Sequence, residues 1–328
     1  MKRIFRSIFR VVGIILLSIA ALLLLWAGVS QLLSLVEKGK EEQLGVSVEV
    51  YGGEMNVYAS GAGGSTIVLM PGLGTAAPAL DFAPLTEKLA ENNRVVVAEP
   101  FGYGWSSLTQ RERSAENIVE ELRAALTAAG EEAPYILMPH SVSGIYAAWY
   151  CQHYPEEISA VIGIDCTLPR QVEYFGGGYP TVTNIAKLAS PLGISRLLCM
   201  IAPATFVSQG GEGVYSDDNL LAQKRLGSRM GYNRCVIDEM NMTGANVDVT
   251  KDIYFIGSLP LLFITRPESS HSARDDGKTS RSFYETYISS PDCQQILELD
   301  APHYMHWAQS EAIARAVEGF LAENIKAA

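Results

Sequence analysis

The feature that most restricts the fold of this chain is a repeated alternation of short apolar β segments with amphipathic helices. A strand that is apolar throughout is buried on both faces, which is typical of a parallel sheet with helices on each side. The sequence therefore predicts an α/β protein with a mostly parallel central sheet. We expect its apolar strands at residues 66–70, 94–98, 135–138, 160–164, 260–265 and 295–299.

Two regions depart from this alternation. Residues 46–51 and 55–59 alternate apolar and polar side chains around a Gly52-Gly53 turn, which predicts an antiparallel hairpin. Residues from about 168 to 258 contain helical stretches, such as 183–198, without clear strands. A helical segment inserted this late in the strand order predicts a cap over the sheet edge at which the strands end.

An uncharged apolar run, Val11–Val29, lies near the N-terminus. As a helix it would be about 28 Å long, close to the ~30 Å hydrocarbon core of a bilayer. Basic residues precede the run and mixed charges follow it, so the positive-inside bias predicts a single-pass cell-membrane protein with a cytoplasmic N-terminus. We divide the chain into a basic tail (1–10), a transmembrane signal anchor (11–36), a linker (37–48) and an extracytoplasmic folded domain that includes the cap (49–328).

A cleaved signal peptide is the competing interpretation of this run. The apolar region of a signal peptide usually spans about 7–15 residues and ends at a small-x-small site. Here the run is longer, and no convincing site of that kind follows Trp26. We therefore expect an uncleaved anchor, which makes the membrane one predicted partner of the chain.

The charge balance and the cysteines exclude several kinds of protein. There are 36 acidic and 25 basic residues, giving a net charge of −11, whereas nucleic-acid binding needs a clustered basic face. No CxxC pair or Cys/His cluster has zinc-ligand spacing, so no metal is expected. We expect buried thiols, with a Cys199–Cys235 bridge as the open alternative. The cysteines are Cys151, Cys166, Cys199, Cys235 and Cys293.

A candidate nucleophile lies in the segment PHSVSG, residues 139–144, which follows a predicted strand and opens a predicted helix. A nucleophile elbow needs this context, because a tight turn lifts one side chain above the sheet edge among small residues. Ser141 is therefore the candidate, although Pro139 and Ser143 replace the glycines of the usual G-x-S-x-G pattern. The alternative is an ordinary serine N-cap on the helix.

A glycine-rich loop, PGLG at residues 71–74, follows the first apolar strand. Backbone N–H groups in such a loop can stabilise the negative charge that develops on a carbonyl oxygen during acyl transfer, by about 2.7–4 kcal/mol per donor. We expect the N–H groups of Leu73 and Val142 to form this oxyanion hole. Residues 102–106 (GYGWS) are expected to form a second tight loop at the same sheet edge.

A histidine between the last strand and the last helix is the candidate general base. Residues 301–307 read APHYMHW, so His303 and His306 compete for this role. We expect His303, because a loop at this place can bring an imidazole over the serine. His140, beside the serine, is expected to pack or to hydrogen-bond locally.

In chain order, the segments PGLG, EPFGYGWSS, PHSVSG and APHYMHW resemble those of the α/β-hydrolase superfamily, from about residue 48 onward. The resemblance implies an α/β-hydrolase fold and a serine hydrolase that forms an acyl-enzyme on Ser141, with His303 as general base. It implies no metal and no dissociable cofactor. Haloalkane dehalogenases and epoxide hydrolases of this fold attack with an aspartate, so Ser141 argues against both chemistries.

The acid that orients the histidine has two candidates. In the superfamily it usually follows the penultimate strand in a G-x-x-D turn, but residues 266–269 here read RPES. Glu268 lies close to the usual place. Some relatives carry the acid after the strand that follows the elbow helix, where this chain has Asp165. We expect Asp165 to orient the imidazole, with Glu268 as the alternative.

These observations leave three functions open. We expect a carboxylic-ester hydrolase or lipase-like enzyme, rather than an amide hydrolase, acting on a small-molecule or lipid-like acyl substrate. One alternative is an aminopeptidase of the proline iminopeptidase type, in which Glu173, Asp217 or Asp218 would hold a substrate amine. The other is a non-catalytic, membrane-tethered binding module, because the elbow is irregular and the acid is displaced.

Overall fold

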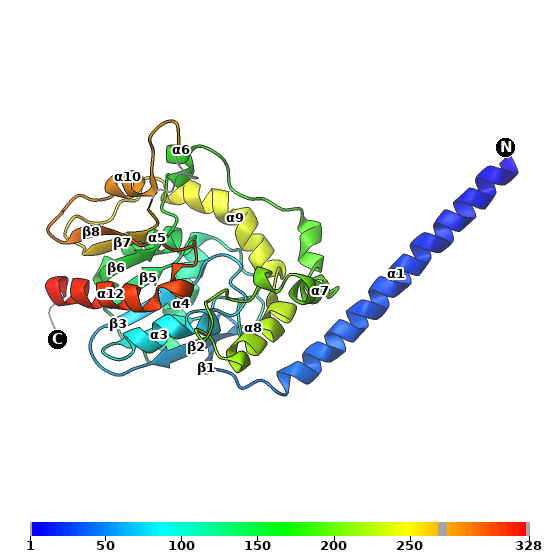
Figure 1. Cartoon of the computed structure of the whole chain (residues 1–328), viewed down its shortest axis with the longest axis horizontal. Helices are drawn as coiled ribbons and strands as arrows, with labels where there is room; N and C mark the ends of the chain where they lie inside the picture. Colours follow the sequence, from blue (N-terminus) through cyan, green and yellow to red (C-terminus); the bar gives the residue numbers. More distant parts are fainter. Residues whose placement is uncertain (1, 268–273, 326–328) are drawn as a thin grey trace.

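The computed structural model describes residues 2–267 and 274–325, and consists of a layered α/β body from which one long helix projects (Figure 1). Runs of β-branched and other apolar residues form the strands. The strands are β1 (Val46–Val50), β2 (Gly53–Ser60), β3 (Thr66–Met70), β4 (Arg94–Ala98), β5 (Tyr135–Pro139), β6 (Ile158–Ile164), β7 (Leu261–Thr265) and β8 (Gln294–Glu298).

In the described part of the chain these strands form one eight-stranded sheet in the order β1-β2-β4-β3-β5-β6-β7-β8. β1 pairs antiparallel with β2, and β2 pairs antiparallel with β4. All other neighbouring pairs are parallel. The predicted mostly parallel sheet is thus confirmed, and the carboxyl ends of β3, β5, β6 and β7 lie side by side.

Helices cover both faces of the sheet. α4 and α5 pack on one face, and α3 and α12 pack on the other. The helices of the described residues are α1 (Lys2–Lys38), α2 (Pro78–Asp81), α3 (Ala83–Leu89), α4 (Ala115–Ala128), α5 (Ser143–His153), α6 (Gln171–Phe175), α7 (Ile194–Ile201), α8 (Asp217–Met230), α9 (Arg234–Thr250), α10 (Ser280–Glu285), α11 (Met305–Ala308) and α12 (Ser310–Asn324), with short 3-10 helices at η1 (Pro155–Glu157), η2 (Asn184–Leu188) and η3 (Pro203–Thr205).

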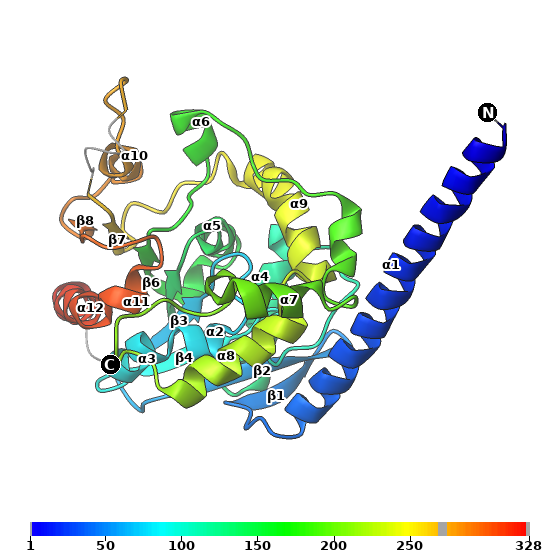
Figure 2. The same cartoon turned by 45° about the vertical axis from the view of Figure 1, so that its right-hand side comes forward.

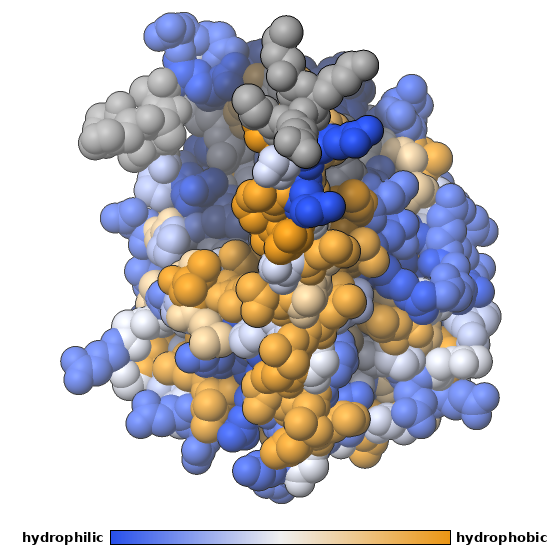
Figure 3. Space-filling model, turned by 90° about the vertical axis from the view of Figure 1, so that its right-hand side faces the viewer, coloured by the Kyte–Doolittle hydropathy of each residue, from blue (hydrophilic) through white to orange (hydrophobic). Residues whose placement is uncertain are grey.

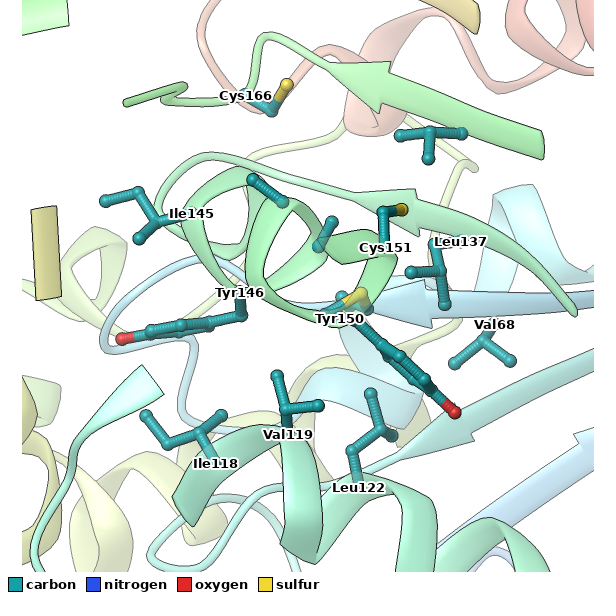
Figure 4. Close-up of a cluster of buried hydrophobic side chains, with 14 of the residues drawn as sticks. Val68, Ile118, Val119, Leu122, Leu137, Ile145, Tyr146, Tyr150, Cys151 and Cys166 are labelled. Atoms are coloured by element: carbon teal, nitrogen blue, oxygen red, sulfur yellow. The ribbon is translucent and has the colours of Figure 1, made fainter. Parts of the chain in front are cut away.

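The core consists of two apolar layers, one on each face of the sheet. Successive strand residues point to opposite faces, so Leu137 of β5 packs under α4 and α5, whereas its neighbour Ile136 packs under α3 and α12. Figure 4 shows the first layer, in which Ile118 of α4 faces Tyr146 of α5 and Leu122 of α4 faces Tyr150 of α5. The two layers fix the sheet, and the sheet fixes the loops at its carboxyl edge.

The helical cap lies between β6 and β7, and it contains α6 to α9. One detail differs from expectation, because residues 183–198 form two helices, η2 and α7, rather than one. Pro191 lies between them, and its ring removes a backbone N–H donor. Gly193 then adopts a positive φ of 72° at the start of α7. The turn reorients α7 toward α1 (Figure 2).

Within the described residues, α1 is the one helix long and apolar enough to cross a membrane. It continues to Lys38, about two and a half turns beyond the apolar run. The expectation of buried thiols is met, since all five cysteines are free and four of them are buried, while Cys293 is half-buried. The Cys199–Cys235 bridge is therefore wrong.

Candidate active site

Ser141 stands on a tight turn between β5 and α5. Its φ is +53°, a left-handed conformation that is uncommon outside glycine and marks a strained turn. Pro139 is accommodated because it is the last residue of β5, paired with Met70. Gly144 is required, since a Cβ there would lie 2.4 Å from the carbonyl oxygen of Thr167. The irregular PHSVSG segment thus has the backbone conformation of an elbow.

The structure brings the three favoured residues into one hydrogen-bonded line. The Nε2 atom of His303 lies 2.9 Å from the Oγ of Ser141, and its Nδ1 lies 2.6 Å from Oδ2 of Asp165. A carboxylate can only accept, so Nδ1 carries the proton and Nε2 is free to accept the hydroxyl proton of the serine. This is the arrangement that a serine nucleophile and its general base require.

Asp165 follows β6, and Arg266 follows the neighbouring strand β7. The guanidinium Nε of Arg266 lies 2.9 Å from the same Oδ2 that binds His303. In the G-x-x-D turn expected after β7, Arg266 stands in the place of the glycine, and its guanidinium pairs with Asp165. Glu268, the alternative acid, lies outside the described residues. Only the adjacency of β6 and β7 reveals this pairing, because 100 residues separate the two strand ends.

His140 supports the loop that carries His303. It is fully buried, and burial lowers its pKa well below the usual range, which keeps the ring neutral. Its Nε2–H donates to the carbonyl oxygen of His303 at 3.1 Å. Gly72 packs against this ring, and a Cβ at position 72 would lie 2.8 Å from Nδ1 of His140. The residue before the serine thus positions the histidine loop.

His306, the rival base, is buried away from Ser141. Its Nε2 lies 2.7 Å from Oδ2 of Asp81, and Trp307 donates its indole N–H to Oδ1 of the same carboxylate at 2.8 Å. Ser208 of the cap also donates to Asp81, at 2.7 Å. His306 therefore joins the last loop, α2 and the cap, and its role is structural.

We expect His306→Ala to lower the stability of the fold strongly and the rate of hydrolysis only slightly. The change removes a buried hydrogen bond to a carboxylate and leaves a cavity, together worth about 2–4 kcal/mol. In the detergent-solubilised full chain this corresponds to a drop in melting temperature of about 3–7 °C. His303→Ala, at a half-exposed position, serves as the comparison. Equal melting temperatures for the two variants would contradict the structural role.

The predicted oxyanion donors lie beside the serine. Leu73 and Val142 line the same pocket as Ser141, which has a volume of about 330 Å³. Val142 is the N-cap residue of α5, where backbone N–H groups point out of the helix. The rest of the lining comes from Thr167, from α6, from the segment 176–180 that follows it, and from Thr243 of α9. The cap therefore forms most of the pocket wall.

A buried hydrogen-bond network, which no sequence motif indicates, links the cap to the predicted oxyanion loop. The hydroxyl groups of Tyr103 and Tyr146 donate to the two carboxylate oxygens of Glu239, on α9, at 2.8 and 2.9 Å. The Tyr103 oxygen also accepts the N–H of Gly74 at 3.2 Å. Burial raises the pKa of Glu239. Through Tyr103, the docked cap holds the glycine-rich loop in place.

Glu99 organises the second predicted loop, GYGWS. Its carboxylate accepts the backbone N–H groups of Ala79 at 3.1 Å and of Trp105 at 2.7 Å. Gly104 must be a glycine, since a Cβ there would lie within 2.1 Å of the Glu99 carboxylate oxygens. Burial raises the pKa of Glu99 to about 7.

We expect Glu99 to make the stability fall as pH rises. Between its unfolded pKa and about pH 7, the folded state keeps the proton that the unfolded chain loses, so unfolding becomes easier by about 3 kcal/mol from pH 5 to pH 8. Glu99→Gln should then gain about 5 °C in melting temperature relative to the wild type over that pH range. Exposed Glu311→Gln is the matched control. Parallel curves for Glu99→Gln and the wild type would contradict this expectation.

Fold and topology together define the class of this protein, which has the α/β-hydrolase fold. A Pseudomonas aeruginosa protein described provisionally as an epoxide hydrolase, solved as a point mutant, superposes with a TM-score of 0.66 at 16% identity, over 86% of this chain and 97% of that one. The epoxide hydrolase VrEH1 from Vigna radiata gives 0.64 at 15% identity, over 84% and 97%.

Among sequence relatives, the chain is 28% identical over 322 residues to the Bacillus subtilis protein named Uncharacterized protein YbdG. The match covers 96% of this chain and 98% of that protein. No protein-family model matches the chain. The solved structures share the fold at low identity, so the chemistry has to be argued from the site itself.

Proposed function

We propose that this chain is a membrane-anchored serine hydrolase that cleaves an ester, or less readily an amide, through an acyl-enzyme on Ser141. The observation that carries the proposal is the hydrogen-bonded line from Ser141 through His303 to Asp165. A serine N-cap or a structural histidine does not need such a line, whereas nucleophilic catalysis does.

The geometry gives each group one role. The Oγ of Ser141 attacks the substrate carbonyl carbon while Nε2 of His303 takes its proton, and the imidazolium then protonates the leaving alcohol or amine. Asp165 holds the ring and stabilises its positive charge. A water molecule next attacks the acyl-enzyme, giving a proton to His303, which returns it to Ser141 as the acid product leaves. The N–H groups of Leu73 and Val142 are assigned to the oxyanion.

The neighbours raise epoxide hydrolysis as a second candidate, and the nucleophile argues against it. Epoxide hydrolases of this fold attack with an aspartate, which forms an alkyl ester that water then cleaves. Position 141 holds a serine. A serine alkoxide that opened an epoxide would form a stable ether, so the site favours an acyl carbonyl.

The pocket chemistry favours an ester with an uncharged acyl group over an aminopeptidase substrate. Among the described residues that line the pocket with Ser141, none carries a carboxylate. Glu173, one proposed amine ligand, is exposed and pairs with Arg170 at 2.8 Å. Asp217 and Asp218 begin α8 and are exposed. These carboxylates therefore do not line the pocket.

A fluorophosphonate probe tests the proposal directly. The full chain in detergent should be labelled at one serine, and mass spectrometry of the labelled peptide should identify Ser141. Parallel assays with p-nitrophenyl esters, aminoacyl arylamides and a styrene-type epoxide should show turnover of the esters first. A folded chain that is neither labelled nor active on any ester would overturn the proposal and favour the binding module.

A further inference from the structure

α7, in the cap, has the reverse of the usual amphipathic arrangement. Its polar residues Ser195 and Arg196 are buried, whereas Ile194, Met200 and Ile201 are exposed. A helix on a water-soluble surface normally turns its apolar stripe to the core. The outward apolar face of α7 therefore needs an apolar partner outside the hydrolase body.

The inward polar face of α7 binds α1. Arg196 forms an ion pair with Glu37 at 2.7 Å and donates to Ser30 and Ser34 of α1 at 3.2 and 2.9 Å. The indole N–H of Trp26 donates to the carbonyl oxygen of Gly193 at 3.0 Å. A second ion pair joins Glu41, just after α1, to Arg229 at the end of α8 at 2.6 Å. These contacts fasten the cap along the last three turns of α1.

The apolar surface of α7 is continuous with that of α1. The exposed apolar residues of the region are Val29, Leu32, Leu33, Leu35 and Val36 on α1 and Val182, Ile185, Leu188, Ile194, Leu197, Met200 and Ile201 on the cap. Figure 3, viewed from the side of α1, shows a column of apolar residues along this helix and further apolar residues beside it. We call the cap part of this surface, residues 182–201, the cap apolar face.

The charges around this face fit a lipid surface. From Thr181 to Thr205 the sequence has no acidic residue, and its two basic residues are Lys187 and Arg196. Both are already paired, Lys187 with Asp238 and Arg196 with Glu37. An apolar helical face without free charges can be buried at the boundary between headgroups and acyl chains.

We propose that the cap apolar face docks into the outer leaflet of the bilayer that α1 crosses, so that the cap is part of the membrane interface. The inference rests on the proposed anchoring by α1. α7 lies beside the C-terminal half of α1, and the N-terminal half of α1 projects away from the body (Figures 1 and 2). Residues 176–180, which line the pocket of Ser141, directly precede η2. Docking therefore brings the mouth of this pocket to the bilayer surface.

The test measures the depth of single labels in nanodiscs of phosphatidylcholine and phosphatidylglycerol that hold one full chain each. Cys293→Ser removes the half-buried thiol, and bimane is then attached at one introduced cysteine. The labelled variants are Leu17→Cys on α1, Ile185→Cys and Ile201→Cys on the cap, and Glu311→Cys on α12. The native side chains at these positions are exposed: Leu17 is 72% exposed, Ile185 76%, Ile201 77% and the side chain of Glu311 65%.

We expect doxyl-labelled lipid to quench the labels at Leu17, Ile185 and Ile201 at least threefold more than the label at Glu311, with aqueous iodide giving the opposite order. Lipid quenching at Leu17 together with iodide quenching at both cap positions would overturn the docking and leave the anchor standing. Iodide quenching at Leu17 would overturn both. One chain per disc excludes a second copy as the quenching partner, and fluorophosphonate labelling of Ser141 reports on the hydrolase proposal separately.

Discussion

Ser141→Ala is expected to lower the rate of ester hydrolysis by about 10³-fold or more, because the nucleophile itself is lost and only binding and the oxyanion donors remain. The change removes one hydroxyl group that lies on the pocket surface, so the melting temperature should stay within about 2 °C of the wild type. Steady-state kinetics with a p-nitrophenyl ester, together with thermal unfolding of the same sample, measures both quantities.

Ser159→Ala is the matched control for this prediction. Its hydroxyl donates to the carbonyl oxygen of Tyr135 at 3.1 Å, at the opposite end of the sheet. Removing it should leave the rate of hydrolysis unchanged. If Ser141→Ala kept more than about a tenth of the wild-type activity, another residue would be the nucleophile, and the hydrogen-bonded line would be a structural feature.

Asp165→Asn is expected to lower the turnover rate by about 10⁴-fold, with a much smaller change in KM. An amide nitrogen in place of the carboxylate oxygen favours the imidazole tautomer that carries its proton on Nε2, and this tautomer cannot accept the proton of Ser141. The variant also leaves Arg266 without its carboxylate partner. Pre-steady-state acylation with a chromogenic ester should show the loss in the first chemical step.

Two further variants test the partner of Asp165 and the alternative acid, Glu268. Arg266→Gln keeps the bond between His303 and Asp165, so we expect at most a tenfold loss of turnover. Glu268→Gln should leave the rate unchanged, because Asp165 already occupies Nδ1 of His303 at 2.6 Å. A large loss with Glu268→Gln and a small one with Asp165→Asn would reverse the assignment of the acid.

Most of the fold could be predicted from local pattern. Apolar strands are encoded within windows of a few residues, so the predicted strands agree with those of the structure to within about two residues at each end. The helix over 183–198 was predicted wrongly, because the apolar pattern continues through Pro191 although the backbone does not.

Some residues of the candidate active site could be predicted from the sequence. Ser141 and His303 follow from the order of short motifs along the chain, since each motif marks one loop at the carboxyl edge of the sheet. The network of Tyr103, Tyr146 and Glu239 was not visible, because its members lie on three elements and resemble ordinary core residues one by one. A buried glutamate on a cap helix carries no signal until its partners are in place.

The sequence by itself determined the fold class, the apolar N-terminal helix, the candidate nucleophile Ser141 and the loop that carries both candidate histidines, because these depend on local periodicity and loop position. Only the tertiary structure chose between His303 and His306 and paired Asp165 with Arg266, because both decisions depend on which strand ends are neighbours. It alone also showed that α7 turns its polar face to α1 and its apolar face outward. That orientation is set by a hydrogen-bond partner about 160 residues away, which no local pattern encodes.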